Sequence, residues 1–422
     1  MRLTNSLSYR WIVLAVAYLG AFCAIGFGRF GYSAILPSMQ EGLGIDSAAA
    51  GSLASWNLAG YTVMAAAGGL LASRLGTHKV VTAGLALTAA GMLLTGLADG
   101  LTAASAGRLV TGLGNGMVLV PSITLMAAWF DVRRLGLASS TVSTGASLAL
   151  VLVGLAIPRI IAGGETDGWR AAWYFFAGIT ACLALLTGIF QRDHPREVAA
   201  SLAGAGSSTP VPRQAPTPAK GLSSGLKTIA RSRYAWHIGL VYLLYGVAFP
   251  MYLTFFQKRL TSDLGLSGEL AGYLFLGLGV GGVLGGGLWG AVSDRIGRGR
   301  TLALMCLVQA VAALVFACGS VTPALAFSAV IFGLAGMGVP GVIGAGCGDQ
   351  FGAVLASSAL GFVTIFMGVG QIVGPYVGGE LADACGSLSY SYLLAAGLFC
   401  AGALSAAFLE ETGWARRKRA RL

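Results

Sequence analysis

Two arginines lie inside long apolar stretches of the sequence, where a charged side chain is costly. Arg29 stands in the stretch 11–36 and Arg108 in the stretch 103–130. An arginine at the centre of a membrane-spanning helix costs roughly 2.5–3.5 kcal/mol on the insertion scale, so it normally turns to protein or to a water-filled cavity. Arg29 could anchor a substrate carboxylate or another anion, or it could donate hydrogen bonds to backbone carbonyls of a neighbouring helix. Arg108 could bind the solute or tie two helices together.

Acidic residues avoid the apolar stretches. All 16 Asp and Glu residues lie in loops or near expected helix ends, and Asp349 and Glu380 come nearest to the middle of a stretch. Two buried arginines without an internal carboxylate make an electropositive interior. A pocket for cationic compounds usually contains an acid, so this balance favours an anionic substrate over a cationic drug.

Amide and phenol side chains form a second group of substrate-binding candidates. Such groups orient a ligand in a mostly apolar pocket. They also form hydrogen bonds between membrane helices, and for each residue taken singly we favour that interpretation. The group comprises Asn57, Asn115, Tyr242, Tyr245, Tyr252 and Gln371.

The other reactive residue types form no catalytic or metal-binding pattern. The 3 histidines do not cluster, and none of the 7 cysteines belongs to a C-x-x-C pair. A membrane-embedded enzyme would need a convergent nucleophile, base or metal cluster. We therefore expect no metal, no cofactor and no enzymatic activity.

The composition indicates that lipid is the main solvent of this chain. Hydrophobic residues make up 56% and charged residues 10% of the sequence, whereas soluble domains carry about 25% charged residues. A membrane-spanning helix needs about 20 mostly apolar residues. Stretches of this kind predict an all-α membrane protein with twelve transmembrane helices, namely Trp11–Leu36, Ala48–Leu71, Val80–Leu97, Ala103–Phe130, Leu137–Ile161, Trp173–Phe190, Trp236–Phe256, Leu270–Val292, Leu302–Gly319, Ala324–Ala345, Val354–Gly379 and Tyr390–Phe408.

Basic residues predict the orientation of these helices. Most of the 27 Lys and Arg residues fall in alternate loops and in the C-terminal tail, on one side of the expected helices. This bias places both termini in the cytoplasm, with the helices in the bacterial inner membrane. It also indicates contact with anionic lipid rather than with nucleic acid. The proline-containing stretch 192–234 is a predicted cytoplasmic linker between six-helix domains at 1–191 and 235–422.

The two halves of the sequence repeat each other. The loop after the second helix recurs after the eighth at one constant offset, with matching residues Arg74, Gly76 and Lys79 and Arg295, Gly297 and Arg300. Asp131 and Asp349 are each followed, at the same distance, by Leu-Ala-Ser-Ser. Duplicated halves place a binding site at their shared interface near the membrane midplane. The repeat therefore predicts two pseudo-symmetric bundles that work by alternating access.

Three motifs in this repeat resemble those of the major facilitator superfamily. They are Ser293-Asp294-Arg295-x-Gly297-Arg298, Arg108-x-x-x-Gly112-x-Gly114 and Gly370-Gln371-x-x-Gly374-Pro375-x-x-Gly378-Gly379. The resemblance implies a twelve-helix fold in which helices 1, 4, 7 and 10 line a central cavity. For Arg108 it implies a link to proton coupling and to contacts with helix 1. The first helix, with Gly26–Tyr32 and Leu36-Pro37, resembles a bacterial branch of the YbfB/YjiJ type.

Two positions depart from the superfamily pattern. Ser73 stands where the first loop motif usually has aspartate, and helix 5 carries Gly154 and Pro158 instead of an adjacent Gly-Pro pair. In the superfamily, an adjacent Gly-Pro pair on helix 5 marks many drug/proton antiporters. The lack of that pair in this sequence disfavours a drug/proton antiporter. We expect a secondary transporter of a small organic anion such as a carboxylate, with proton coupling left open. The alternatives are a proton-coupled exporter of drugs or metabolites and a non-transporting membrane sensor.

Charged residues in the repeated loops are candidates for gating. Ion pairs in such loops can break and re-form as the two halves rock, and we expect Asp294 to pair with Arg295 at the cytoplasmic face. The predicted gating group comprises Arg74, Asp294, Arg295 and Arg298. A monomer would suffice for this mechanism.

Overall fold

The computed structural model describes residues 2–164, 167–195, 197–198 and 227–409. These residues form helices joined by short turns, and none of them lies in a β-strand. Twelve helical segments among them are long and apolar enough to cross a membrane. Lipid offers no hydrogen bonds to the backbone, and a helix satisfies its own N–H and C=O groups. The predicted all-α fold with twelve membrane helices is confirmed.

The first six spans are built from eight helical elements. The first span, Tyr9–Leu43, is longer than predicted and includes a π-helical segment, called η1, that the sequence did not predict. The elements are α1 (Arg2–Ala21), η1 (Phe22–Phe30), α2 (Gly31–Leu43), α3 (Ser47–Leu75), α4 (Thr77–Gly96), α5 (Leu101–Trp129), α6 (Val132–Ala162) and α7 (Gly168–Phe190).

The other six spans follow from residue 233. The eleventh helix continues from the tenth as one element, α15, which is broken at Gly352, where φ is 72°. The tenth span accordingly covers Thr322–Gly352 and the eleventh Ser358–Cys385. The elements are α10 (Arg233–Thr254), α11 (Phe256–Lys258), η3 (Arg259–Asp263, a short π-helix), α12 (Gly268–Ile296), α13 (Arg298–Cys318), α14 (Thr322–Gly336), α15 (Val339–Cys385) and α16 (Ser389–Ala407).

The repeated loops have the same backbone geometry. Gly76 joins α3 to α4 with φ 96° and ψ 142°, and Gly297 joins α12 to α13 with φ 97° and ψ 159°. A residue with a side chain rarely adopts a positive φ of this kind. Glycine is therefore required at both positions, which explains why the repeat keeps it.

The described chain divides into two compact units. The described residues of unit 1 fall within 1–31, 56–149 and 167–219, and those of unit 2 fall within 32–55, 150–166 and 220–422. Unit 2 thus holds α2, the start of α3 and the end of α6 together with the second-half helices. The predicted domain borders at 191 and 235 are not borders of these units, and they stay a prediction. Most of the predicted linker lies outside the described residues.

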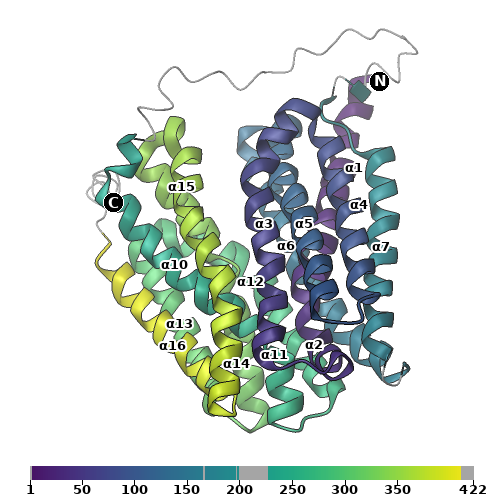
Figure 1. The fold of residues 1–422 in the computed structure, drawn as a ribbon. Coiled ribbons are helices and arrows are strands. Elements are labelled where there is room, and N and C mark those ends of the chain that lie inside the picture. Colours follow the sequence, from purple (N-terminus) through teal and green to yellow (C-terminus); the bar gives the residue numbers. More distant parts are fainter. Residues whose placement is uncertain (1, 165–166, 196, 199–226, 410–422) are drawn as a thin grey trace. The chain divides into compact units, whose positions relative to one another are not determined.

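Each unit is a bundle of long helices. In unit 1, α4 contacts both α5 and α7, and Figure 1 shows these three helices running alongside one another. In unit 2, α10 packs against α15 and α16, and α12 packs against α14. Every one of these helices is therefore covered along at least one face by another helix of its own unit.

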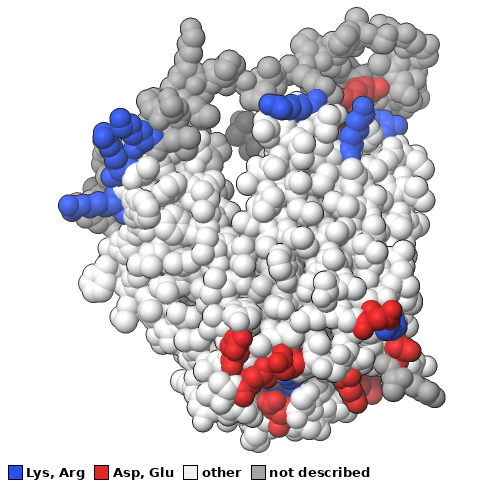
Figure 2. Space-filling view, in the orientation of Figure 1, with Lys and Arg blue, Asp and Glu red and all other residues white. Residues whose placement is uncertain are grey.

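Charged side chains gather at the ends of the helices. Within each unit, Figure 2 shows mainly Lys and Arg at one end of the helices and mainly Asp and Glu at the other, with uncharged residues between them. We call these the basic end and the acidic end. A band without charges is what a bilayer requires of a lipid-facing surface.

Candidate functional site

Arg29 lies on η1, in the middle of the first membrane span. The N–H of Gly31 donates to the carbonyl of Gly26, five residues earlier, which is the hydrogen-bond pattern of a π-helix. The Arg29 side chain is half-buried. Its guanidinium carbon lies 5.5 Å from the ring centroid of Phe30 and 5.6 Å from that of Tyr61 on α3. Both distances are within cation–π range, so two aromatic rings flank the charge.

Arg108 is a buried tie between α5 and η1. The residue is only 1% exposed, and its Nη1 donates to the carbonyl oxygen of Gly28 at 2.8 Å. Its guanidinium carbon lies 5.2 Å from the ring centroid of Trp173 on α7. These contacts correspond to the structural alternative for Arg108. Its predicted role in substrate binding stays a prediction.

Asn57 and Asn115 are fully buried between helices of unit 1. The amide Nδ2 of Asn57 donates to the backbone carbonyl of Arg108 at 3.2 Å, and Asn115 Oδ1 accepts from Thr88 Oγ1 at 3.2 Å. Gly112 permits the crossing of α3 and α5, because a Cβ there would lie 2.0 Å from the carbonyl oxygen of Asn57. Both asparagines therefore form contacts between helices.

The predicted helix 7 tyrosines lie in the interior of unit 2, on α10. Tyr245 donates its hydroxyl to the carbonyl of Gly336 at 3.0 Å, and the Tyr252 hydroxyl lies 2.8 Å from Ser328 Oγ. Tyr242 stacks on Tyr245 with ring centroids 5.9 Å apart. All three are at most 3% exposed, as is Gln371 on α15. The ring contacts of the three tyrosines are those of an aromatic core.

The structure thus divides the eight substrate-binding candidates between the two units. Arg29, Arg108, Asn57 and Asn115 lie in unit 1, and the other four lie in unit 2. Tyr61, which flanks Arg29 directly, is not among the predicted site residues. The available signal was its position four residues after Asn57, which puts both on one face of α3.

An ionic cluster occupies the basic end of unit 2. Arg298 Nη1 lies 2.8 Å from Asp294 Oδ1, and Arg298 Nε lies 2.9 Å from Asp349 Oδ2. Asp294 thus pairs with Arg298 rather than with Arg295, because the turn at Gly297 brings the first residue of α13 beside the last turn of α12. Arg295 and Arg74 are exposed. The first half has Ser73 and Thr77 at the positions that match Asp294 and Arg298.

The glycine-proline motif of α15 packs against two different helices. A Cβ on Gly374 would lie 2.2 Å from the carbonyl oxygen of Val247 on α10. On another face of α15, a Cβ on Gly379 would lie 2.2 Å from the carbonyl oxygen of Ser47 on α3. The motif therefore lets α10 and α3 approach α15 at backbone distance.

Polar contacts surround the start of α3 at the acidic end of unit 2. The carboxylate of Asp383 accepts from the backbone N–H groups of Ser47 and Ala48, at 3.2 and 2.7 Å. Lys258 Nζ donates to Ser47 Oγ at 2.6 Å. Burial lowers the pKa of Lys258, and the nearby carboxylates of Asp383, Asp263 and Asp46 partly oppose this shift. Asp383 thus caps the first turn of a helix whose N–H groups need acceptors.

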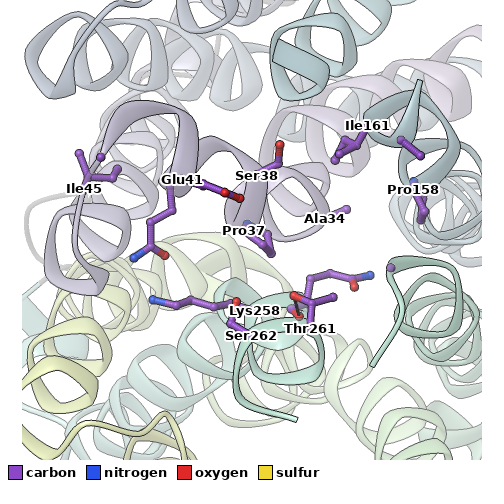
Figure 3. A pocket seen from close by; sticks show the side chains of 15 residues that line it. Ala34, Pro37, Ser38, Glu41, Ile45, Pro158, Ile161, Lys258, Thr261 and Ser262 are labelled. Atoms are coloured by element: carbon purple, nitrogen blue, oxygen red, sulfur yellow. Dashed lines mark hydrogen bonds between the residues drawn. The ribbon is translucent and has the colours of Figure 1, made fainter. Parts of the chain in front are cut away.

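A cavity of about 920 Å³ lies beside these contacts, between the end of α2, the end of α6 and the segment 257–268. Figure 3 shows Lys258, Thr261 and Ser262 on one side and Pro37, Ser38 and Glu41 on the other. One basic and one acidic side chain line this cavity, so its charge does not select an anion.

Comparison with known proteins decides the family. A sequence model of the Major Facilitator Superfamily matches residues 18–343 and 240–421. The chain belongs to the major facilitator superfamily. It is therefore a transporter and not an enzyme, as its relatives and fold agree. The narrower YbfB/YjiJ-type branch stays a prediction.

Relatives extend over nearly the whole chain. The probable sulfoacetate transporter SauU of Cupriavidus necator is 25% identical over 412 residues, covering 93% of each chain. A mutant of the nucleoside transporter NupG has a TM-score of 0.75 at 16% identity, covering 94% of this chain and 100% of its own. The inward-open xylose transporter XylE from E. coli has a TM-score of 0.74 at 15% identity, covering 96% of this chain and 97% of its own. Both solved structures are like this chain in fold.

Proposed function

We propose that this superfamily member is a secondary transporter for small organic anions that carry a carboxylate or a sulfonate. The observation that carries the proposal is Arg29, a half-buried cation in the middle of the first span, flanked by Phe30 and Tyr61. A guanidinium presents its donors in a planar fork that matches such anionic groups. The relationship to a probable sulfoacetate transporter supports this substrate class.

The distribution of acidic residues also supports an anion. Among the described residues of the first six spans, Glu41 is the single acidic residue, and it lies two positions before the end of its span. Arg29 therefore lies in a region whose fixed charges are basic. An anionic substrate would compensate part of the cost of burying that charge. A cationic drug would add to it.

Alternating access between the two halves would move the anion. We place the basic ends of the helices in the cytoplasm, because Lys and Arg mark cytoplasmic ends of membrane helices. The acidic ends then face outward from the inner membrane. The contacts of Asp383 with Ser47 and Ala48 join the second half of the sequence to the first, and they would open and close as the halves rock. One chain holds all these parts, so we propose a monomer surrounded by lipid.

Transport by purified protein in proteoliposomes tests this function. We expect counterflow of labelled sulfoacetate, which requires no knowledge of the coupling ion, and an imposed pH gradient then tests proton coupling. Arg29→Ala should reduce the flux at least tenfold, and Arg29→Lys should retain part of it. Arg159→Ala, which removes an exposed arginine paired with Glu269, is the matched control. Wild-type flux in Arg29→Ala, or transport of cationic drugs but no anion, would contradict the proposal.

A further inference from the structure

We propose that Arg108 is a positioning residue, which holds the π-helical segment η1 so that Arg29 is aimed at the substrate. This inference rests on the proposed function, because it assumes that Arg29 binds the transported anion. It assigns Arg108 a role different from direct binding. It also gives η1 a purpose, since π-helical turns inside α-helices often occur at functional sites.

The register of η1 determines where Arg29 points. Each hydrogen bond of a π-helix spans five residues, whereas each one of an α-helix spans four. Each residue of an α-helix turns the chain by about 100°, so a change between the two patterns changes the direction of the side chains that follow. If the segment Phe22–Phe30 reverted to α-helix, Arg29 would rotate away from Tyr61 on α3. Holding the π-helical register is therefore a way to hold the arginine.

The carbonyl of Gly28 is the point at which η1 is held. This backbone oxygen accepts a hydrogen bond from Arg108 Nη1 at 2.8 Å. A charged donor forms a stronger hydrogen bond than a neutral one. The bond sits one residue before Arg29, so it acts directly on the backbone that carries the proposed anchor.

Glycines bring η1 close enough to be held. A Cβ on Gly26 would lie 1.9 Å from Cβ of Ala149, and a Cβ on Gly28 would lie 2.7 Å from Oδ1 of Asn115. Phe27, which lies between them in sequence, stacks on Phe176 with ring centroids 4.3 Å apart. A larger residue at position 28 would therefore move the segment away from α5, or displace the Asn115 side chain.

Arg108 is itself fixed. It is 1% exposed, its guanidinium lies against Trp173, and its backbone carbonyl accepts from Asn57 Nδ2. A side chain enclosed in this way acts on a ligand through its neighbours. Arg108 acts through Gly28 on Arg29, which follows Gly28 in the sequence and is half-buried.

Glycine substitutions test the proposal without removing either arginine. We expect Gly28→Ala to raise the KM for sulfoacetate counterflow about tenfold at unchanged kcat, because binding is lost while the transport step is kept. Gly20→Ala is the matched control, since a Cβ there meets its nearest neighbour at an ordinary 3.4 Å. A wild-type KM in well-folded Gly28→Ala together with a wild-type KM in well-folded Arg108→Lys would overturn the proposal.

A double-mutant cycle separates positioning from direct binding. Arg108→Lys should raise KM in the wild-type background and leave it unchanged in Arg29→Ala, because coupled residues are non-additive. Equal effects in both backgrounds would mean that Arg108 acts independently of Arg29, and would overturn the proposal. If Arg29→Ala itself leaves KM unchanged, the anion-anchor function fails as well. If only the Gly28 and Arg108 variants behave as wild type, that function stands without this inference.

Discussion

Gly51 on α3 meets Pro375 on α15 at backbone distance. A Cβ on Gly51 would lie 2.2 Å from the carbonyl oxygen of Pro375, and the same separation holds between a Cβ on Gly379 and the carbonyl of Ser47. The repeat places Gly272 on α12 at the position that matches Gly51. A Cβ on Gly272 would lie 2.1 Å from the carbonyl of Gly154. Two related crossings thus join segments of unit 2 at its acidic end.

Gly51→Ala should destabilise the protein, because the added methyl group has no room at this crossing. Overpacking of this kind typically costs about 1–3 kcal/mol. Gly69→Ala on the same helix is the matched control, since a Cβ there meets nothing within 4 Å. Alanine favours helix over glycine by up to about 1 kcal/mol, so the control should be neutral or stabilising. The melting temperatures of both variants are measured in detergent. An equal decrease in both would contradict the close packing of Gly51 against Pro375.

The sequence predicted the fold because its signals are regular and strong. Apolar stretches of spanning length gave the twelve helices, and the loop repeat gave Gly76 and Gly297, which share one unusual backbone geometry. Helix ends were less certain, because the apolar composition continues beyond them, as in the tenth span. The π-helix at Phe22–Phe30 has no sequence signature of its own. Its register depends on packing against other helices.

The candidate site was predictable by residue type but not by contact. Arg29 and Arg108 were identified because charge in an apolar stretch is rare. Two contacts of the site depend on how three helices pack. They are the hydrogen bond from Arg108 to the Gly28 carbonyl and the position of the Tyr61 ring beside Arg29. Hydrophobicity does not encode such pairings. Likewise, the pairing of Asp294 with Arg298 follows from the turn at Gly297, which the motif alone did not specify.

The two carboxylates that contact Arg298 should contribute unequally. The Asp349 side chain is 19% exposed, whereas that of Asp294 is 58% exposed. Exposed ion pairs contribute about 0–1 kcal/mol and are screened by salt. Asp349→Asn should therefore lower the melting temperature more than Asp294→Asn does, and added salt at about 0.5 M should abolish only the smaller effect. Equal losses at low and high salt would show that exposure does not control this cluster.

Lys258 should make stability depend on alkaline pH. Burial lowers its pKa below the ordinary value of 10.5, so the unfolded chain binds this proton more tightly than the folded protein does. Stability therefore rises with pH between the lowered pKa and 10.5, and the gain is absent below that window. Melting temperatures measured upward from about pH 8 should rise in the wild type relative to Lys258→Met. A constant difference between the two proteins over this range would contradict the shift.

Tyr252 should contribute to stability and not to substrate binding. Ser328 Oγ donates to the carbonyl of Ala312 at 2.7 Å, so the Tyr252 hydroxyl must be the donor in its 2.8 Å bond to Ser328. Tyr252→Phe deletes that donor, and loss of one such bond costs about 1 kcal/mol. The ring stacks on Phe332, with centroids 3.6 Å apart. Phenylalanine keeps this ring, so the aromatic packing of the core should be retained in the variant.

Thermal stability and transport kinetics measured on the same preparations distinguish the two roles of Tyr252. We expect a lower melting temperature with an unchanged KM, whereas Tyr390→Phe, at an exposed position of α16, should change neither quantity. An increase in KM as large as that of Arg29→Ala would instead show that the Tyr252 hydroxyl reaches the substrate. The helix 7 tyrosines would then join Arg29 in the binding site, and burial in this structure would describe only one state of the transport cycle.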